Sequence, residues 1–144
     1  MEMVVVMGVI ALGLAVVVPM VQSGLNTREV RRAARQVASL MHFCHGEAIA
    51  HGQPIALFID PRKNEIRTSD SQRTATLTEL AKIERVDGGI DIGEGVVEID
   101  FFPNGSTSGA EVVLSRRDDR VSGEKLGIVL DPLLGTVRVR EGSG

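Results

Sequence analysis

The chain has 144 residues and a net charge of −3 at pH 7, with four phenylalanines, no tyrosine and no tryptophan. The length fits one domain, the shortage of aromatic residues argues against base-stacking platforms and aromatic ligand cages, and the acidic balance gives no general attraction to nucleic acid. A single cysteine, Cys44, excludes an internal disulfide and a metal site with two cysteine ligands.

An uncharged apolar run, Met3–Val21, follows Glu2 at the start of the chain. As a helix it is about 29 Å long, close to the roughly 30 Å of a hydrocarbon core, and it shows no signal-peptide pattern. We therefore expect residues 1–21 to form a transmembrane or filament-core helix, kinked or locally unwound at Pro19. The span residues that we single out, several of them small enough for close helix packing, are Met3, Gly8, Ala11, Gly13, Ala15 and Val18.

Residues 22–52 have the pattern of an amphipathic helix that ends near Gly52, before Pro54. Apolar residues recur at spacings of three and four, namely Val30, Ala34, Val37, Met41, Cys44 and Ala48. Four arginines lie off this stripe, at Arg28, Arg31, Arg32 and Arg35. They fit either a solvated face with some attraction to lipid phosphates or a contact with acidic patches of neighbouring subunits.

Residues 53–144 change to the pattern of short strands. We expect strands over 55–60, 65–68, 90–92, 96–102, 110–115, 125–131 and 136–140, and a mobile tail over 141–144. Residues 70–76 are predicted to be a loop, and 77–86 fits either a short helix or a strand. The sequence therefore predicts an α+β fold, in which a long N-terminal helix, first transmembrane and then amphipathic, packs on an antiparallel β domain.

A Glu that opens an uncharged helix, a proline seventeen residues later, an amphipathic helix and a β domain together resemble the type IV pilin and pseudopilin class. The loop Phe102-Pro103-Asn104-Gly105-Ser106 resembles the Phe-Pro-x-Gly-Ser loop of the minor pseudopilin H (GspH/FimT) family, and residues 135–140 resemble that family's last strand. The loop also has a physical interpretation, since Pro103 fixes one backbone angle and Gly105 allows a conformation that other residues avoid.

The resemblance implies a pilin-like fold and a minor pseudopilin, a structural subunit of the periplasmic pseudopilus of a type II protein secretion system. It implies a single inner-membrane span with a periplasmic globular domain. The implied partners are the major pseudopilin, other minor pseudopilins, the inner-membrane assembly platform, membrane lipid and, before assembly, the prepilin peptidase, with N-methylation after cleavage. Glu2 would pair with the N-terminal amine of a neighbouring subunit and set the axial register.

Two other interpretations stay open. The chain could be a type IV pilus minor pilin of the FimT type, which binds DNA through Arg138 and Arg140 with help from Arg116 and Arg117, although the acidic charge disfavours nucleic acid. It could also be a membrane-anchored binding module. We expect no enzyme activity, catalytic residue or cofactor, because no catalytic motif is present. We expect no metal either, with Cys44 in the core and His42, His45 and His51 at the surface or its boundary.

Overall fold

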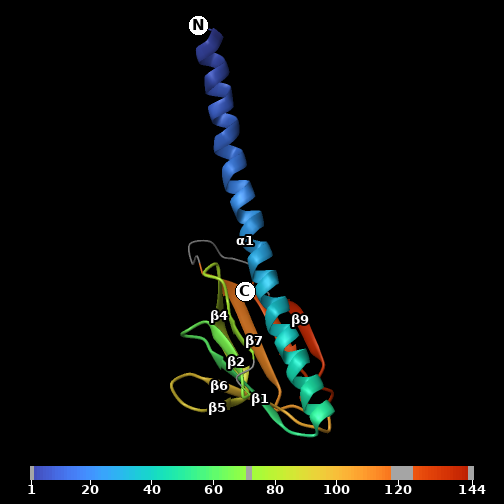
Figure 1. Cartoon of the computed structure of the whole chain (residues 1–144). Helices are drawn as coiled ribbons and strands as arrows, with labels where there is room; N and C mark the ends of the chain where they lie inside the picture. Colours follow the sequence, from blue (N-terminus) through green and yellow to red (C-terminus); the bar gives the residue numbers. More distant parts are fainter. Residues whose placement is uncertain (1, 71–72, 118–124, 143–144) are drawn as a thin grey trace.

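The computed structural model describes residues 2–70, 73–117 and 125–142, without the side chains of residues 16–26. This part of the chain contains one long helix and nine strands (Figure 1). The helix is α1 (Glu2–His51). The strands are β1 (Ile55–Asp60), β2 (Glu65–Thr68), β3 (Thr74–Thr76), β4 (Ala81–Gly88), β5 (Ile90–Asp91), β6 (Val97–Phe101), β7 (Ala110–Arg116), β8 (Lys125–Leu130) and β9 (Val137–Gly142). The expected α+β architecture, a long helix packed on an antiparallel β domain, is confirmed.

The helix α1 ends where the sequence predicts. Its last residue is His51, and Gly52 adopts a φ of 62°, the left-handed conformation that commonly closes a helix. All six residues of the predicted apolar stripe are buried, whereas the four arginines are exposed. The helix continues through Pro19, so the expectation of local unwinding there was wrong. The side chains of Pro19 and Val18 lie outside the described residues. The spacing of apolar residues thus correctly placed the helix face that packs on the β domain.

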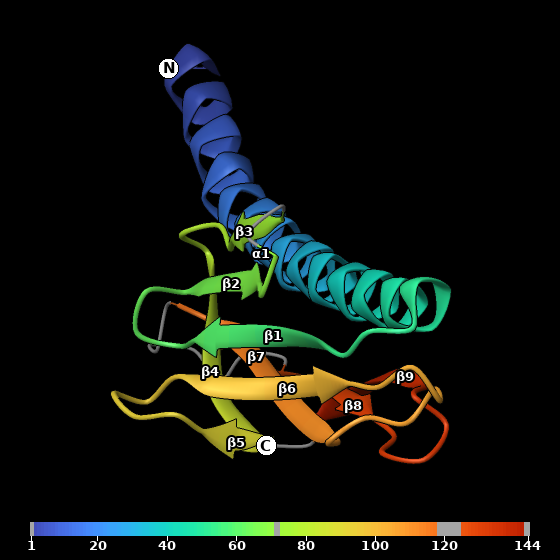
Figure 2. The ribbon, with the colours of Figure 1, turned by 60° about the horizontal axis from the view of Figure 1, so that its bottom comes forward.

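The strands form two antiparallel sheets, which α1 joins into one core. The first sheet has the order β3-β2-β1-β6-β5, and the second has the order β4-β7-β8-β9. Figure 2 shows the strands of the first sheet running across those of the second, with α1 beside both. The core side chains come from α1 and from alternate positions of both sheets, for example Met41, Leu57, Ile99, Phe101, Leu114 and Ile128.

Two expectations for residues 70–86 were wrong or incomplete. Residues 74–76 were expected in a loop, but they form β3, which pairs with β2. Backbone pairing and one buried side chain, Ala75, hold this strand in the sheet. Because its other residues are polar, no apolar alternation in the sequence indicated a strand. The helical alternative for 77–86 is also wrong, because Ala81–Gly88 is strand β4. A β-bulge between Ile83 and Arg85 interrupts the alternation of inward and outward side chains along β4. Because of this interruption, the sequence fitted either a helix or a strand.

Asn64, in the turn between β1 and β2, links the two sheets. Its side-chain Nδ2 donates to the carbonyl of Ala81 at 2.7 Å, and its Oδ1 accepts from the backbone N–H of Ile83 at 2.9 Å. The residue is buried and adopts a φ of 57°, which asparagine tolerates better than most residues. Asn64 therefore holds the start of β4, in the second sheet, against the first sheet.

Replacing Asn64 by alanine should lower the free energy of unfolding by about 2–3 kcal/mol, because two buried backbone groups lose their partners and the left-handed conformation becomes strained. Denaturant unfolding of the detergent-solubilised full chain measures the effect. Asn104→Ala, in an exposed loop, is the matched control and should cost less than about 1 kcal/mol. Equal losses for the two variants would contradict the assigned role of Asn64.

Candidate functional site

The N-terminal half of α1 projects away from the β domain and exposes apolar side chains (Figure 1). The large side chains between Met3 and Leu14 are 56–83% exposed, and no atom lies within 4 Å of the Cβ position of Gly8 or Gly13. Glu2, Ala11 and Ala15 are exposed as well. We call residues 2–15 the projecting segment. Within the described residues, no helix combines the length and hydropathy that a membrane span requires.

The second half of α1 presents its arginines on the side opposite to the core. The guanidinium of Arg31 lies 3.2 Å from the Glu141 carboxylate in β9. Both side chains are largely exposed, so the pair contributes little stability but marks where the helix meets the last strand. Arg28, Arg32 and Arg35 are exposed and make no ion pair with a described residue. Three of the four predicted arginines therefore remain available for a lipid or protein contact.

The loop Phe102–Gly109 contacts both α1 and the turn between β8 and β9. Gly105 adopts a φ of 87°, as expected of the glycine in this loop, and its N–H donates to the Phe102 carbonyl at 3.0 Å. The imidazole Nε2 of His45, in α1, lies 3.0 Å from the Gly105 carbonyl. On the other side of the loop, the Thr107 N–H donates to the carbonyl of Pro132 at 2.8 Å. The loop thereby ties the end of α1 to the turn between β8 and β9.

The turn between β8 and β9 is held by one carboxylate. The backbone N–H groups of Leu133 and Leu134 donate to Asp131 Oδ1 at 2.8 and 2.9 Å. These two hydrogen bonds, first that from Leu134, hold the pKa of Asp131 below its ordinary value. The turn thus keeps a fixed shape against the loop Phe102–Gly109.

Cys44 and the histidines occupy the positions expected of structural residues. Cys44 is fully buried, His42 and His51 are exposed, and His45 is half-buried against the loop Phe102–Gly109. No group of three or more potential metal ligands occurs among the described residues. The expected placement of Cys44 in the core is confirmed.

The Cys44 thiol should react with a maleimide at pH 8 far more slowly in the folded than in the denatured chain. Burial raises its pKa from 9.0 to about 12, which lowers the thiolate fraction roughly 1,000-fold at this pH. Since the raised pKa belongs to the folded state, the linked stability is complete below pH 9 and falls as the pH rises toward 12. Labelling rates with and without denaturant test this, and equal rates would contradict the burial of Cys44.

The predicted basic residues Arg138 and Arg140 lie on one face of the second sheet. In the strand register, Arg140 pairs with Gly127, and Gly127 pairs with Val113. Alternation along the strands places the following side chains on this surface, which we call the outer face: Lys82, Arg85, Asp87, Glu111, Val113, Ser115, Lys125, Gly127, Val129, Arg138 and Arg140. The opposite face of the same sheet carries Val112, Leu114 and Ile128 and belongs to the core.

The structure does not bring Arg116 and Arg117 to the same place. Arg116 alternates with Leu114 and so faces away from the outer face, at the end of β7 opposite to Glu111. Arg117 follows the strand. Three carboxylates also interrupt the basic surface, because Asp87 and Glu111 share it and Glu84 lies within 2.7 Å of the Lys125 ammonium. This hydrogen-bonded ion pair holds the pKa of Glu84 below its ordinary value.

The family comparison matches the model "Type II transport protein GspH" over residues 33–133. The chain belongs to the GspH family. The matched segment includes α1 from Ala33 onward, the loop Phe102–Gly109, β8 and the first three residues of the turn between β8 and β9, but not the projecting segment. Membership of the GspH family, expected from the sequence, is confirmed.

Solved structures show the same fold as this GspH family chain. One structure of the minor pseudopilin EpsH from the type II secretion system of Vibrio cholerae has a TM-score of 0.63 at 15% identity, over 81% of this chain and 97% of that chain. Another gives 0.60 at 17% identity, over 78% and 97%. The type IV minor pilin FimU of Pseudomonas aeruginosa gives 0.59 at 11% identity, over 82% and 96%. No curated protein sequence matches the chain significantly.

Sequence reasoning missed three residues with structural roles in this GspH family chain. Asn64 reads as an ordinary turn residue, His45 as a boundary residue, and Gly127 as a glycine in an apolar run. Only Gly127 carried a usable signal, because glycine is disfavoured inside a strand and often marks a close approach of another backbone. Its partners in neighbouring strands become visible only in the folded chain.

Proposed function

We propose that the chain is a minor pseudopilin, a structural subunit of the pseudopilus of a type II secretion system. The observation that carries this proposal is the projecting segment, whose large apolar side chains are more than half exposed. A helix that is apolar on all sides requires an apolar environment, and packing against the equivalent helices of other pilin-like subunits provides one. Membership of the GspH family supports the same role.

Before assembly, the apolar run Met3–Val21 would hold the subunit in the inner membrane, with the β domain in the periplasm. This part of the proposal rests on the uncharged sequence of the run. The inner-membrane assembly platform would then move the helix from lipid into the filament, where the major pseudopilin and other minor pseudopilins replace lipid as neighbours. Gly8, Ala11, Gly13 and Ala15 would permit close contact between these helices.

Glu2 would determine the axial position of the helix in the filament. It lies at the exposed start of α1, next to the apolar side chains that would enter the filament core. A carboxylate carried into such a core requires a partner, and the N-terminal amine of a neighbouring subunit is a partner of opposite charge. The pair would form only at the correct axial offset between two helices, and so it favours that offset.

Replacing Glu2 by glutamine should reduce incorporation into filaments at least about tenfold, because the neighbouring amine is left without its charge partner in a medium of low dielectric constant. The membrane-bound fraction should stay unchanged. Co-purification of the full chain with the major pseudopilin measures incorporation. Glu79→Gln removes an exposed carboxylate from the β domain and is the matched control. Normal incorporation of the Glu2 variant would remove Glu2 from the mechanism.

A type IV pilus minor pilin that binds DNA is the second candidate. Arg138 and Arg140 favour it, because both are exposed on the outer face. The carboxylates of Glu84, Asp87 and Glu111 on or beside this face oppose it. Fluorescence anisotropy with duplex DNA at two salt concentrations separates the candidates. Salt-sensitive binding that an Arg138→Ala, Arg140→Ala double variant loses would favour the DNA-binding pilin, whereas no binding would favour the secretion pseudopilin.

A further inference from the structure

The turn between β8 and β9 carries two adjacent leucines that point into solvent. The side chain of Leu133 is 81% exposed and that of Leu134 is 67% exposed. The backbone does not require leucine at either position, because neither residue adopts a positive φ, and turns more commonly carry polar residues that hydrogen-bond to the backbone. The two side chains therefore form an apolar surface that the fold of this chain does not use.

Hydrogen bonds hold the two leucines in a fixed position. Their N–H groups both donate to the Asp131 carboxylate, and the Gly135 N–H donates to the Asp131 carbonyl at 3.0 Å. The Asp131 N–H donates to the carbonyl of Thr136 at 2.9 Å. The hydroxyl of Thr107 donates to the Asp131 carbonyl at 3.1 Å and so anchors the turn to the loop Phe102–Gly109. A partner that binds the leucines does not have to order them first, which lowers the entropic cost of binding.

Two further exposed apolar side chains lie close to this turn. Ile49 is in the last turn of α1, and its Cδ1 lies 3.9 Å from the Cβ position of Gly105. Phe102 accepts the N–H of Gly105 with its carbonyl. The Gly105 carbonyl oxygen in turn lies 2.7 Å from the Cβ position of Gly135, the residue that follows Leu134. We call the following residues the distal patch: Ile49, Phe102, Leu133 and Leu134.

The distal patch lies at the end of the molecule opposite to the projecting segment (Figure 1). Ile49 and the projecting segment belong to the same helix, so the direction of that helix fixes where the patch faces. If projecting segments bundle side by side in a filament, the β domains follow one another along its axis. The distal end of one β domain then faces the β domain of the subunit one step farther along. Such a contact joins two different surfaces, does not close, and can repeat along a filament.

The chemistry of the distal patch favours an apolar partner. None of its four residues is charged, and two charged side chains that flank it have partners within the chain. The Asp131 carboxylate accepts two N–H groups, and the Glu47 carboxylate lies 3.1 Å from the imidazole of His51. A strongly charged segment would find no free counter-charge on these two residues.

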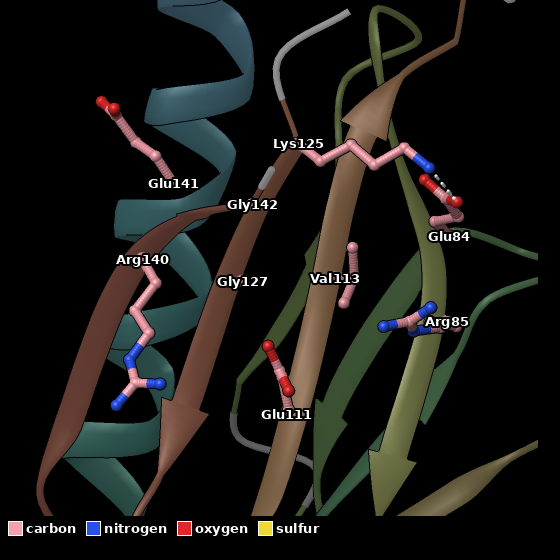
Figure 3. Close-up of a pocket in the computed structure, with 9 residues that line it drawn as sticks. All are labelled: Glu84, Arg85, Glu111, Val113, Lys125, Gly127, Arg140, Glu141 and Gly142. Carbon is pink, nitrogen blue, oxygen red and sulfur yellow. Dashed lines mark hydrogen bonds and ion pairs between the residues drawn. The ribbon is translucent and has the colours of Figure 1, made fainter. Parts of the chain in front are cut away.

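The groove over Gly127, on the outer face of the second sheet, differs from the distal patch in its charge (Figure 3). It has a volume of about 310 Å³. The Oε1 of Glu111 lies 2.7 Å from the Cβ position of Gly127, so a carboxylate of the chain itself already occupies the space above the glycine. Three basic and three acidic side chains line the groove, namely Arg85, Lys125, Arg140, Glu84, Glu111 and Glu141. These balanced charges select no partner, whereas the distal patch selects an apolar one.

We propose that the distal patch docks on an apolar surface of the β domain of the next pilin-like subunit along the filament, on the side away from the membrane. Leu133 and Leu134 are the anchors of this contact, because they are the most exposed apolar side chains of the patch and the turn holds them in place. This docking proposal rests on the proposed role as a filament subunit. It adds a contact between β domains to the packing of the helices.

Replacing both leucines by serine tests the proposal in cells that assemble filaments with the full chain. The Leu133→Ser, Leu134→Ser double variant should co-purify with the major pseudopilin at least about tenfold less, because two apolar side chains no longer become buried at the contact. Its membrane-bound fraction and its denaturant unfolding should stay unchanged, because both side chains are exposed. Leu80→Ser is the matched control and should co-purify normally. Leu80 is half exposed and precedes Ala81, at the end of the second sheet opposite to Leu130.

Photo-cross-linking identifies what covers the distal patch. A photoreactive benzoylphenylalanine in place of Leu133 should cross-link to the β domain of another pilin-like subunit, mapped by mass spectrometry. The same photoreactive residue in place of Leu80 should give at least about fivefold less of this product, because it lies at the other end of the β domain.

Three outcomes would overturn the docking proposal. The first is normal entry of the double variant into filaments. The second is a chain that enters filaments while position 133 cross-links only to lipid, to a secreted protein or to nothing. The third is a loss of unfolding stability in the double variant, which would mean that the leucines pack within their own chain. In all three outcomes the proposed function still stands, whereas an unmodified chain that never enters filaments would refute both.

Discussion

Replacing Phe101 by alanine should lower the free energy of unfolding by about 3–5 kcal/mol, because the substitution removes a large aromatic side chain from a closed core. Phe101 is fully buried in β6, where it pairs with Ile55 in the neighbouring strand and forms a bridge with Thr107. A cavity at this position would affect the core between the sheets and also the start of the loop Phe102–Gly109. Denaturant unfolding of the detergent-solubilised full chain measures the loss.

The adjacent phenylalanine provides the control for this substitution. Phe102 is 38% exposed and belongs to the loop, so Phe102→Ala should cost less than about 1 kcal/mol. A comparable loss for both variants would mean that the general reduction in apolar volume, and not the burial of Phe101, determines the effect. A small loss for both would place Phe101 outside the core.

Replacing Gly135 by alanine should lower the free energy of unfolding by about 3 kcal/mol or more. Gly135 adopts a φ of 64°, and a Cβ there would lie 2.3 Å from His45 Nε2 and 2.7 Å from the Gly105 carbonyl oxygen. The oxygen belongs to the backbone and cannot rotate away. The new methyl group would therefore separate the His45 ring from the loop Phe102–Gly109 or displace the turn between β8 and β9.

Gly52→Ala separates backbone strain from this steric conflict. Gly52 has a similar φ of 62°, but no atom lies within 4 Å of its Cβ position. Its replacement should cost only about 1 kcal/mol, the strain of the left-handed conformation. If the two variants lose equal stability, the close packing of α1, the loop and the turn is not what requires glycine at position 135.

The loop at residues 102–109 shows how the sequence and the tertiary structure contribute differently to one site. Phe102, Pro103, Asn104 and Gly105 predicted a tight turn, and the φ of Gly105 confirms it. Nothing in this motif indicated that His45 would lie against the Gly105 carbonyl, or that Pro132 would accept the Thr107 N–H. The motif specifies a local backbone conformation, whereas its contacts come from segments 60 residues earlier and 25 residues later in the chain.

The sequence by itself determined the helix, its buried stripe from Val30 to Ala48, its end at Gly52 and most of the strands, because spacing and capping act between residues that are close along the chain. The sequence also indicated the apolar run at the start of the helix and the family. Only the tertiary structure decided the strand order, the link through Asn64 and the groove over Gly127. Strand pairing joins residues that are far apart in sequence, and alternation identifies the buried face of a strand without identifying its neighbours.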